Sequence, residues 1–409
     1  ADDGKVTGHH AIIITENIPG KLPLDEAILF LESYLSETRK VYPMIYYALG
    51  YFHACRGEKA HALDYYRKAE KEDHSYCFPN RIEEVLILQN ALELNDRAAK
   101  AAYSLGNFWY AARQYDRAIE CWETSAAICP DFPTVWRNLS LAYYNKQDNK
   151  AKALEALEKA FRLDENDSRI LMELDQLYKR LGYSHERRLA FLETHLSTTE
   201  ERDDLAIERI TLYNQLGRYD EAKALIAGRK FHPWEGGEGK ITGQYVLCRV
   251  ELARVALREQ RYADALALLE ETDQYPYNLG EGKLANAEEN DIWYKGEAYR
   301  GLGDEEKAKV CFEKATVGSA EPQQAFYYND QQPDKIFYQG LAWRALGAEN
   351  RARGCFNKLI KHGEKHLFDT CRIDYFAVSL PDLAIWEDDL NKRNRIHCNY
   401  VMGLGYLGL

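Results

Sequence analysis

The feature that most constrains this chain is the spacing within residues 101–130, which read AAYSLGNFWYAARQYDRAIECWETSAAICP. Its informative positions are Leu105, Gly106, Trp109, Ala118, Trp122 and Pro130. Large residues at intervals of three and four give each of two helices a buried stripe, and the small residues Gly106 and Ala118 let the two backbones approach closely. Pro130 stops the second helix. The spacing therefore predicts a hairpin of two helices.

This spacing recurs before and after the stretch at intervals of roughly 35 residues. The clearest positions in the other copies are Gly50, Ala62 and Tyr66; Leu139, Ala153 and Leu157; Leu174, Tyr178 and Phe191; Gly217, Ala222 and Ile226; Ala256, Ala265 and Leu269; Gly296, Ala308 and Phe312; and Gly340, Ala352 and Phe356. In the copy that begins at Leu174, Arg187 replaces the small residue. The repetition predicts an all-α superhelix, a solenoid of about eight or nine helix pairs with several long loops between repeats.

These positions are the signature of the tetratricopeptide (TPR) repeat, and the chain resembles proteins of that class. A stack of such hairpins has no single core that limits its size, so 409 residues fit one continuous array. The resemblance implies a binding or scaffolding module.

The repeat pattern divides the chain into three predicted segments, bounded by where the pattern begins and where Gly-rich loops interrupt it. The predicted segments are an N-terminal segment with a lead-in helix (1–40), an N-terminal TPR array (41–230) and a C-terminal TPR array with Gly-rich insert loops (231–409). Residues 24–35 predict an amphipathic helix with Ala27, Phe30, Leu31 and Tyr34 on one side, and residues 78–95 predict a single unpaired helix. Residues 12–15 are consistent with a short strand or the tail of a removed region. The first residue is Ala, which indicates a fragment or a processed form.

The net charge and the cysteines indicate which classes of partner and which cellular compartment suit this chain. A net charge of −12 without a long basic run argues against nucleic acid, and no apolar run approaches the roughly 20 residues that span a bilayer. Nine cysteines without a CxxC pair favour a reducing compartment. Cys121, Cys311 and Cys355 each precede the bulky position of a second helix, which predicts small packing residues rather than disulfides or ligands.

Four unusual connections lie in the second half of the chain. They are residues 231–240 (FHPWEGGEGK), 275–283 (YPYNLGEGK), 325–334 (AFYYNDQQPD) and 374–382 (DYFAVSLPD). Loops on one side of successive repeats stack together, so we expect these loops to lie near one another and to form a candidate site. The phosphate-binding pattern is not met, because Ile241 follows the GEGK run where Ser or Thr is required.

The loops carry aromatic, amide and carboxylate side chains that suit a sugar. The candidate ligand-binding residues are Trp234, Glu235, Glu238, Lys240, Asn278, Glu281, Tyr327, Tyr328, Asp330, Asp374 and Tyr375. An aromatic face packs on the apolar side of a pyranose, and carboxylates and amides bind its hydroxyl groups. The alternative is that Trp234 and Tyr275 fill the gap between repeats while the glutamates cap helix N-termini.

No metal or cofactor is expected. His362 and His366 could place two imidazoles on one helix face, with Glu364 between them in sequence. The sequence places no third ligand nearby, and exposed histidines on a polar helix are common. We therefore predict no metal site and assign no catalytic residue.

Four segments carry a narrower resemblance. They are residues 234–240, 278–283, 374–382 and the final GLGYLGL at 403–409. They resemble a family of large bacterial TPR proteins in which the TPR half follows an N-terminal β-rich region similar to aldose mutarotases. The resemblance covers residues 75–409. It implies a cytoplasmic bacterial protein and an association with sugars, without a defined reaction.

The concave face of a TPR superhelix is the second candidate surface. Its predicted binding residues are Tyr103, Asn107, Tyr110, Arg137, Asn138, Arg169, Trp293, Arg300 and Arg344, and the predicted face also includes Tyr144, Arg254, Phe337, His397 and Tyr400. Alternating arginines and aromatic residues suit an extended peptide or an acidic group. The alternatives are a solvated helix surface, or a surface covered by the N-terminal domain that the family resemblance implies.

Part of this face is similar to the carboxylate clamp of chaperone-binding TPR proteins. Asn107, Asn138 and Arg169 stand where the clamp has Asn, Asn and Lys. Tyr103 replaces its first Lys and Glu173 replaces its final Arg. Glu173 reverses the charge that should meet a carboxylate, which argues against binding of a peptide C-terminus.

The sequence is therefore consistent with two functions. The first is a TPR binding or scaffold module whose partner is a protein, or the N-terminal domain of the same polypeptide. The second is part of a carbohydrate-active enzyme, similar to a glycoside hydrolase, whose C-terminal loops bind a saccharide. The enzyme predicts two loop carboxylates that converge in a pocket, one with a raised pKa, whereas the scaffold predicts dispersed or helix-capping carboxylates.

Overall fold

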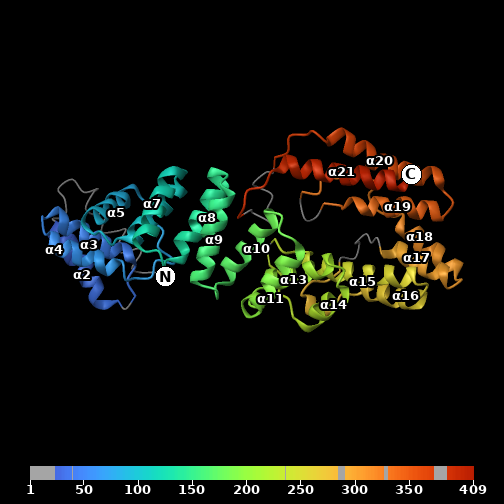
Figure 1. The fold of residues 1–409 in the computed structure, drawn as a ribbon, viewed down its shortest axis with the longest axis horizontal. Helices are drawn as coiled ribbons and strands as arrows, with labels where there is room; N and C mark the ends of the chain where they lie inside the picture. The colour runs from blue at the N-terminus through green and yellow to red at the C-terminus, as the bar shows by residue number, and fades with distance from the viewer. Residues whose placement is uncertain (1–23, 39, 235, 284–290, 327–329, 373–384) are drawn as a thin grey trace. The chain divides into compact units, whose positions relative to one another are not determined.

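The computed structural model describes residues 24–38, 40–234, 236–283, 291–326, 330–372 and 385–409 (Figure 1). The only regular elements in these described residues are α-helices and 3₁₀-helices, so the predicted all-α fold is confirmed. The chain forms two compact units, residues 1–174 and 175–409. The predicted strand or tail at residues 12–15 lies outside the described residues.

Unit 1 is built from paired helices with two additions. Its helices are α2 (Leu24–Glu37), α3 (Pro43–Cys55), α4 (Lys59–Ala69), α5 (Ile82–Leu94), α6 (Ala99–Ala111), α7 (Tyr115–Ile128), α8 (Pro133–Gln147), α9 (Lys150–Leu163) and the first part of α10 (Ser168–Arg180). Hairpins form between α3 and α4, α6 and α7, and α8 and α9. The single helix predicted for residues 78–95 is α5, which packs on α3 and α6.

Unit 2 continues the pairing through the rest of the chain. Its helices are α11 (His185–Thr194), α12 (Leu196–Thr199), α13 (Asp203–Gln215), α14 (Tyr219–Gly228), α15 (Lys240–Arg258), α16 (Tyr262–Glu270), α17 (Asp291–Gly301), α18 (Glu305–Ala315), α19 (Pro333–Ala345), α20 (Glu349–His366) and α21 (Leu390–Gly408), with 3₁₀ turns η1 (Glu271–Asp273) and η2 (Tyr277–Leu279). The hairpins are α13 with α14, α15 with α16, α17 with α18 and α19 with α20, and α21 packs along α20.

The small residues of the repeat have a more specific role than the predicted backbone contact. In four hairpins the glycine of the first helix lies against an aromatic ring of the second. The pairs are Gly50 with Tyr66, Gly106 with Trp122, Gly296 with Phe312 and Gly340 with Phe356, and a Cβ built at each glycine would lie 2.3–2.4 Å from the ring. The glycine therefore makes room for a ring, while Ala118 is fully buried beside it.

The hairpin of α10 and α11 carries a different pair. The small position of the second helix is its fourth residue, which is Ala118 in α7 and Ala153 in α9. In α11 the fourth residue is Arg188, so the predicted substitution at Arg187 is off by one residue. Arg188 is buried, with its Nη2 2.5 Å from Asp175 Oδ2.

The lead-in helix α2 buries a different set from the predicted one. Leu31 and Ala27 are buried as expected, but Phe30 is 47% exposed. Ile28 is buried in its place, because the packed stripe of α2 that faces α3 runs through residues 27, 28 and 31. The pattern located the helix correctly and its apolar face only in part.

The cysteines are all free thiols. Cys355 is buried, whereas Cys121 and Cys311 are only half-buried, so the predicted packing role holds fully at one of the three repeat positions. Burial raises the pKa of Cys121 to about 11, which makes that thiol unreactive at neutral pH. Within the described part of the chain, no helix is both long and apolar enough to cross a membrane.

Candidate functional site

Unit 2 contains a groove of about 760 Å³. It is lined by the first helices of three successive hairpins, α15, α17 and α19, together with α21 and one residue of α16. Its lining residues are Glu251, Arg254, Leu257, Arg258, Tyr262, Trp293, Tyr294, Glu297, Asp334, Phe337, Tyr338, Leu341, Tyr400, Leu404 and Leu407. These residues repeat at intervals of three and four within each helix, so each helix contributes one stripe.

Aromatic side chains form one wall of the groove. The ring centroid of Trp293 lies 4.9 Å from that of Tyr294 and 5.7 Å from that of Tyr338. The hydroxyl oxygens of Tyr294 and Tyr338 are 2.5 Å apart, and burial raises the pKa of both phenols. The two phenols therefore stay neutral at physiological pH and offer an amphipathic surface.

The charged residues of the groove differ in how they are paired. Arg254 Nη1 lies 2.5 Å from Glu251 Oε1, and Glu297 accepts a hydrogen bond from Arg300 at 2.7 Å. Burial raises the pKa of Glu297. Arg258 is exposed, and among the described residues no carboxylate lies within ion-pair distance of its guanidinium. Arg258 is therefore the groove cation most available to an external carboxylate.

Only part of this groove follows from the sequence reasoning. Of the predicted concave-face residues, Arg254, Trp293, Phe337 and Tyr400 line it. The reasoning missed Arg258, Tyr294 and Tyr338 as site residues. The signal was present, because Arg258 follows Arg254 by four residues and so lies on the same face of α15.

Three predicted concave-face residues of unit 1 line a second cavity, of about 300 Å³. They are Tyr103, Arg137 and Arg169. Asn107 and Asn138 join them through hydrogen bonds, because Asn138 Nδ2 donates to Asn107 Oδ1 at 3.2 Å and Arg137 Nη1 donates to Asn138 Oδ1 at 3.2 Å. The structure thus brings this predicted set together.

Glu173 neutralises the clamp-like set from within. Its carboxylate is fully buried and accepts two hydrogen bonds from Arg137, at 2.6 and 2.7 Å. It also accepts from Arg169 Nε at 3.0 Å. The guanidinium groups of Arg137 and Arg169, which would contact a ligand carboxylate, are therefore already paired with the carboxylate of Glu173. This pairing agrees with the charge reversal expected from Glu173 in the sequence.

Three other predicted concave-face residues contact their own hairpins. Tyr110 packs with its ring centroid 5.2 Å from that of Trp122. Arg300 lies 4.7 Å above the ring of Phe312. Arg344 lies 5.2 Å above the ring of Phe356 and forms two hydrogen bonds of 3.0 Å with Glu349. None of the three lines the groove or the second cavity.

Two of the Gly-rich loops lie together, as expected from the stacking of repeats. Asn278 connects them, since its backbone O accepts a hydrogen bond from Phe231 N at 2.8 Å. Its Nδ2 donates to Ile226 O at 2.7 Å and to Arg229 O at 2.8 Å, at the end of α14. Glu281 Oε2 accepts from Gly239 N, the N-cap of α15, at 3.0 Å. The side chains of Asn278 and Glu281 therefore form hydrogen bonds with backbone groups. For Glu281 this is the helix-capping role that was the alternative to sugar binding.

The other described loop residues make local contacts. Glu238 Oε2 accepts from Gly236 N at 2.8 Å, and Lys240 Nζ lies 5.9 Å from the ring centroid of Trp234. Asp330 accepts from Phe326 N at 2.9 Å. The predicted residues Glu235, Tyr327, Tyr328, Asp374 and Tyr375 lie outside the described residues.

Histidine groups occur in both units. His362 and His366 have ring centroids 4.6 Å apart on α20, and His397 of α21 lies 6.5 Å from His362. Burial lowers the pKa of His362 to about 4, and His366 Nδ1 lies 2.6 Å from Asp369. A tighter group of His53, Glu58 and His61, which the sequence reasoning missed, lies in unit 1.

Comparison with known proteins identifies the repeats. Residues 134–167 and 295–316 match the family model of the tetratricopeptide repeat. Similar solved structures include YrrB, described as a TPR protein with an unusual peptide-binding site, at 14% identity over 55% of this chain and 97% of YrrB, with a TM-score of 0.34. PilF of Pseudomonas aeruginosa is 18% identical over 55% of this chain and 91% of its own, with a TM-score of 0.30. MamA of Desulfovibrio magneticus RS-1 is 19% identical over 50% of this chain and 98% of its own, with a TM-score of 0.28.

Proposed function

We propose that this chain, which carries tetratricopeptide repeats, is a protein-binding module that holds an extended peptide segment of its partner in the groove of unit 2. The observation that supports this function is the composition of the groove. Six aromatic and four leucine side chains line one cavity together with an arginine that has no described ion-pair partner. Aromatic residues and arginine are the residue types most enriched at the centres of protein interfaces.

The chemistry of the groove indicates the kind of segment it binds. An aromatic or aliphatic side chain of the partner packs against Trp293, Phe337 and Tyr338 and removes apolar surface from water. An acidic side chain beside it meets Arg258. A peptide that combines an apolar anchor with an acidic residue is therefore the expected ligand class.

A charge-swap experiment tests this function. We would measure fluorescence anisotropy of labelled twelve-residue peptides with a central Trp-Leu anchor and acidic, neutral or basic flanks. The wild-type chain should bind the acidic set most tightly. Arg258→Glu should weaken binding of the acidic set about tenfold or more, since a bound cation becomes a like charge, and should improve binding of the basic set.

Two results would contradict the proposal. One is the absence of binding for all three sets. The other is equal binding of the acidic set by wild type and Arg258→Glu. Arg261→Glu provides the matched control, because Arg261 is exposed three residues further on, outside the groove, and is paired with Glu259 and Asp264.

A domain of the same polypeptide would use the same groove if it presents such a segment. The saccharide and glycoside hydrolase predictions concern the loops instead. Among the described loop residues, Asn278 and Glu281 hold backbone groups, and no observation there favours a sugar. The peptide groove is accordingly the function that we propose.

A further inference from the structure

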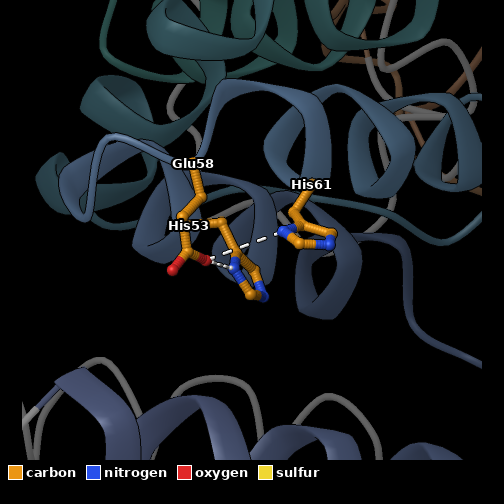
Figure 2. A group of neighbouring side chains, drawn as sticks. All are labelled: His53, Glu58 and His61. Carbon is orange, nitrogen blue, oxygen red and sulfur yellow. Dashed lines mark hydrogen bonds and ion pairs between the residues drawn. The ribbon is translucent and has the colours of Figure 1, made fainter.

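The turn between α3 and α4 brings together three side chains with metal-ligating atoms. His53 lies in the last turn of α3, Glu58 is the N-cap of α4, and His61 lies in the first turn of α4. Figure 2 shows the three side chains turned toward one another across this turn. One ligand atom from each lies within 4.8 Å of the other two.

The distances between these atoms suit a small cation. Glu58 Oε2 lies 2.6 Å from His53 Nδ1 and 3.8 Å from His61 Nδ1 (Figure 2). Ligands of tetrahedral Zn²⁺ at bond lengths of about 2.0–2.1 Å are about 3.3 Å apart, so the two observed distances lie on either side of that value. The side chain of His61 is 72% exposed, so the packing around it leaves room for its ring to rotate toward Glu58.

The other oxygen of Glu58 is held separately. Its Oε1 lies 2.8 Å from Arg56 Nη2, and Arg56 Nη1 lies 2.9 Å from Asp25 Oδ1. This arrangement orients the carboxylate and leaves Oε2 for the two imidazoles. Arg56 contacts the oxygen that a metal would not use.

His53 is held in place by its surroundings. Its side chain is only 10% exposed, and its ring stacks on Tyr65 with centroids 5.3 Å apart and planes at 18°. His53 Nε2 is buried without a described hydrogen-bond partner, and the nearest carboxylate oxygen to it is Glu32 Oε1 at 3.9 Å. Metal-bound histidines characteristically donate their second ring N–H to a carboxylate, and Glu32 is the carboxylate placed nearest for that role.

The charges around the turn also favour a dication. Asp25, Glu32 and Glu58 contribute three carboxylates, and Arg56 contributes one guanidinium. Two negative charges are therefore not balanced by Arg56. The set of two imidazoles and one carboxylate is a known ligand set for Zn²⁺ with an open fourth position.

We propose that His53, Glu58 and His61 bind a divalent cation of the Zn²⁺ class, with a water molecule as fourth ligand. The cation joins the end of α3 to the start of α4 and so stabilises the first helical hairpin. This site is distinct from the peptide groove, which lies in unit 2, and its role is structural.

Calorimetric titration of the full chain with ZnCl₂, after removal of metal by a chelator and under reducing conditions, tests the site. Wild type should show a saturable site that is weakened about tenfold or more in both His61→Ala and Glu58→Gln. Zn²⁺ should also raise the melting temperature of wild type more than that of His61→Ala. His61 is exposed and Glu58→Gln conserves shape, so both variants should fold, as circular dichroism would verify.

A matched control separates this site from other histidines and thiols. His366→Ala removes one member of the histidine pair on α20 and should bind Zn²⁺ as wild type does. Equal titrations of wild type, His61→Ala and Glu58→Gln would overturn the proposal, because the metal would then be bound elsewhere. Absence of Zn²⁺ binding by wild type would overturn it as well.

Discussion

His74 is a buried histidine of unit 1 whose neighbours fix its charge state. Its Nδ1 lies 3.0 Å from Glu72 O and its Nε2 lies 3.4 Å from Tyr47 OH. Burial lowers the pKa of His74 to about 4, and the nearby Lys100 acts in the same direction. The imidazole is therefore neutral in the folded protein at pH 7.

This shift predicts loss of stability in acid. The pKa of an unfolded histidine is about 6.5, so the unfolded chain binds a proton at higher pH than the folded chain does. The stabilisation by neutral His74 is present above pH 6.5 and is lost as the pH falls toward 4. The melting temperature of His74→Gln should therefore fall less between pH 7 and pH 5 than that of wild type. An equal fall would contradict the assignment, and exposed His185→Gln should behave as wild type.

Gly106 is predicted to be intolerant of any side chain. A Cβ at this position would lie 2.4 Å from the indole of Trp122, which is buried. Gly106→Ala should lower the free energy of unfolding by about 1–3 kcal/mol, as overpacking does. Gly354→Ala is the control, since nothing lies within 4 Å of its Cβ and alanine favours the helix by about 0.5–1 kcal/mol. Chemical denaturation of both variants gives the comparison, and a neutral Gly106→Ala would refute the ring-contact account.

The pattern of small and large residues along the sequence was enough to predict which positions pack between the two helices of a hairpin. Small and large residues at fixed spacing identify Gly106, Ala118 and Trp122 as packed positions, because a helix periodicity maps directly onto a face. The sequence could not show that the glycine faces a ring, or that Phe30 is exposed, since those details depend on where the neighbouring helix crosses.

At the scale of elements, the α10–α11 hairpin replaces small residues by an ion pair. Asp175 accepts two hydrogen bonds from Arg188, at 2.5 and 3.0 Å, and Arg188 also donates to Glu208 at 2.7 Å. Burial raises the pKa of Asp175, and Arg188 opposes that effect. Each member of the pair therefore depends on the other to remain charged in the core.

Removing one partner should cost more than removing both. Arg188→Met leaves the Asp175 carboxylate buried without its guanidinium and should lower the free energy of unfolding by about 3–5 kcal/mol. The double variant Asp175→Ala/Arg188→Met should be more stable than Arg188→Met alone, because no unpaired charge remains between the two helices. Denaturation of the single and double variants gives the coupling energy. Additive losses would show that the pair is not a unit.

In the Gly-rich loops, the repeat spacing predicts which loops are neighbours but not which groups their side chains contact. The neighbouring position of loops 231–240 and 275–283 follows from repeat stacking, and the hydrogen bonds from Phe231 N to Asn278 O and from Gly239 N to Glu281 confirm it. The partner of each carboxylate could not be predicted, since a glutamate beside Gly-rich sequence suits a ligand and a helix cap equally well. Backbone geometry at Gly239, the N-cap of α15, makes Glu281 a cap.

At the scale of the whole molecule, the repeat determines the architecture, and the proposed function depends on the groove. The all-α fold, the unpaired α5 and the long connections follow from periodicity alone. The groove does not, because its lining comes from residues more than a hundred positions apart, from Glu251 to Leu407. Only the stacking of α15, α17, α19 and α21 brings those stripes together.

The most direct test of peptide binding in this groove compares two tyrosines of α21. Tyr400 lines the groove and is 52% exposed, whereas Tyr406 lies outside it and is 60% exposed, so a charge at either position leaves the core intact. Calorimetry with the acidic Trp-Leu peptide should show about tenfold weaker binding to Tyr400→Glu and unchanged binding to Tyr406→Glu. Equal affinity of wild type and Tyr400→Glu would contradict the claim that the groove is the binding site.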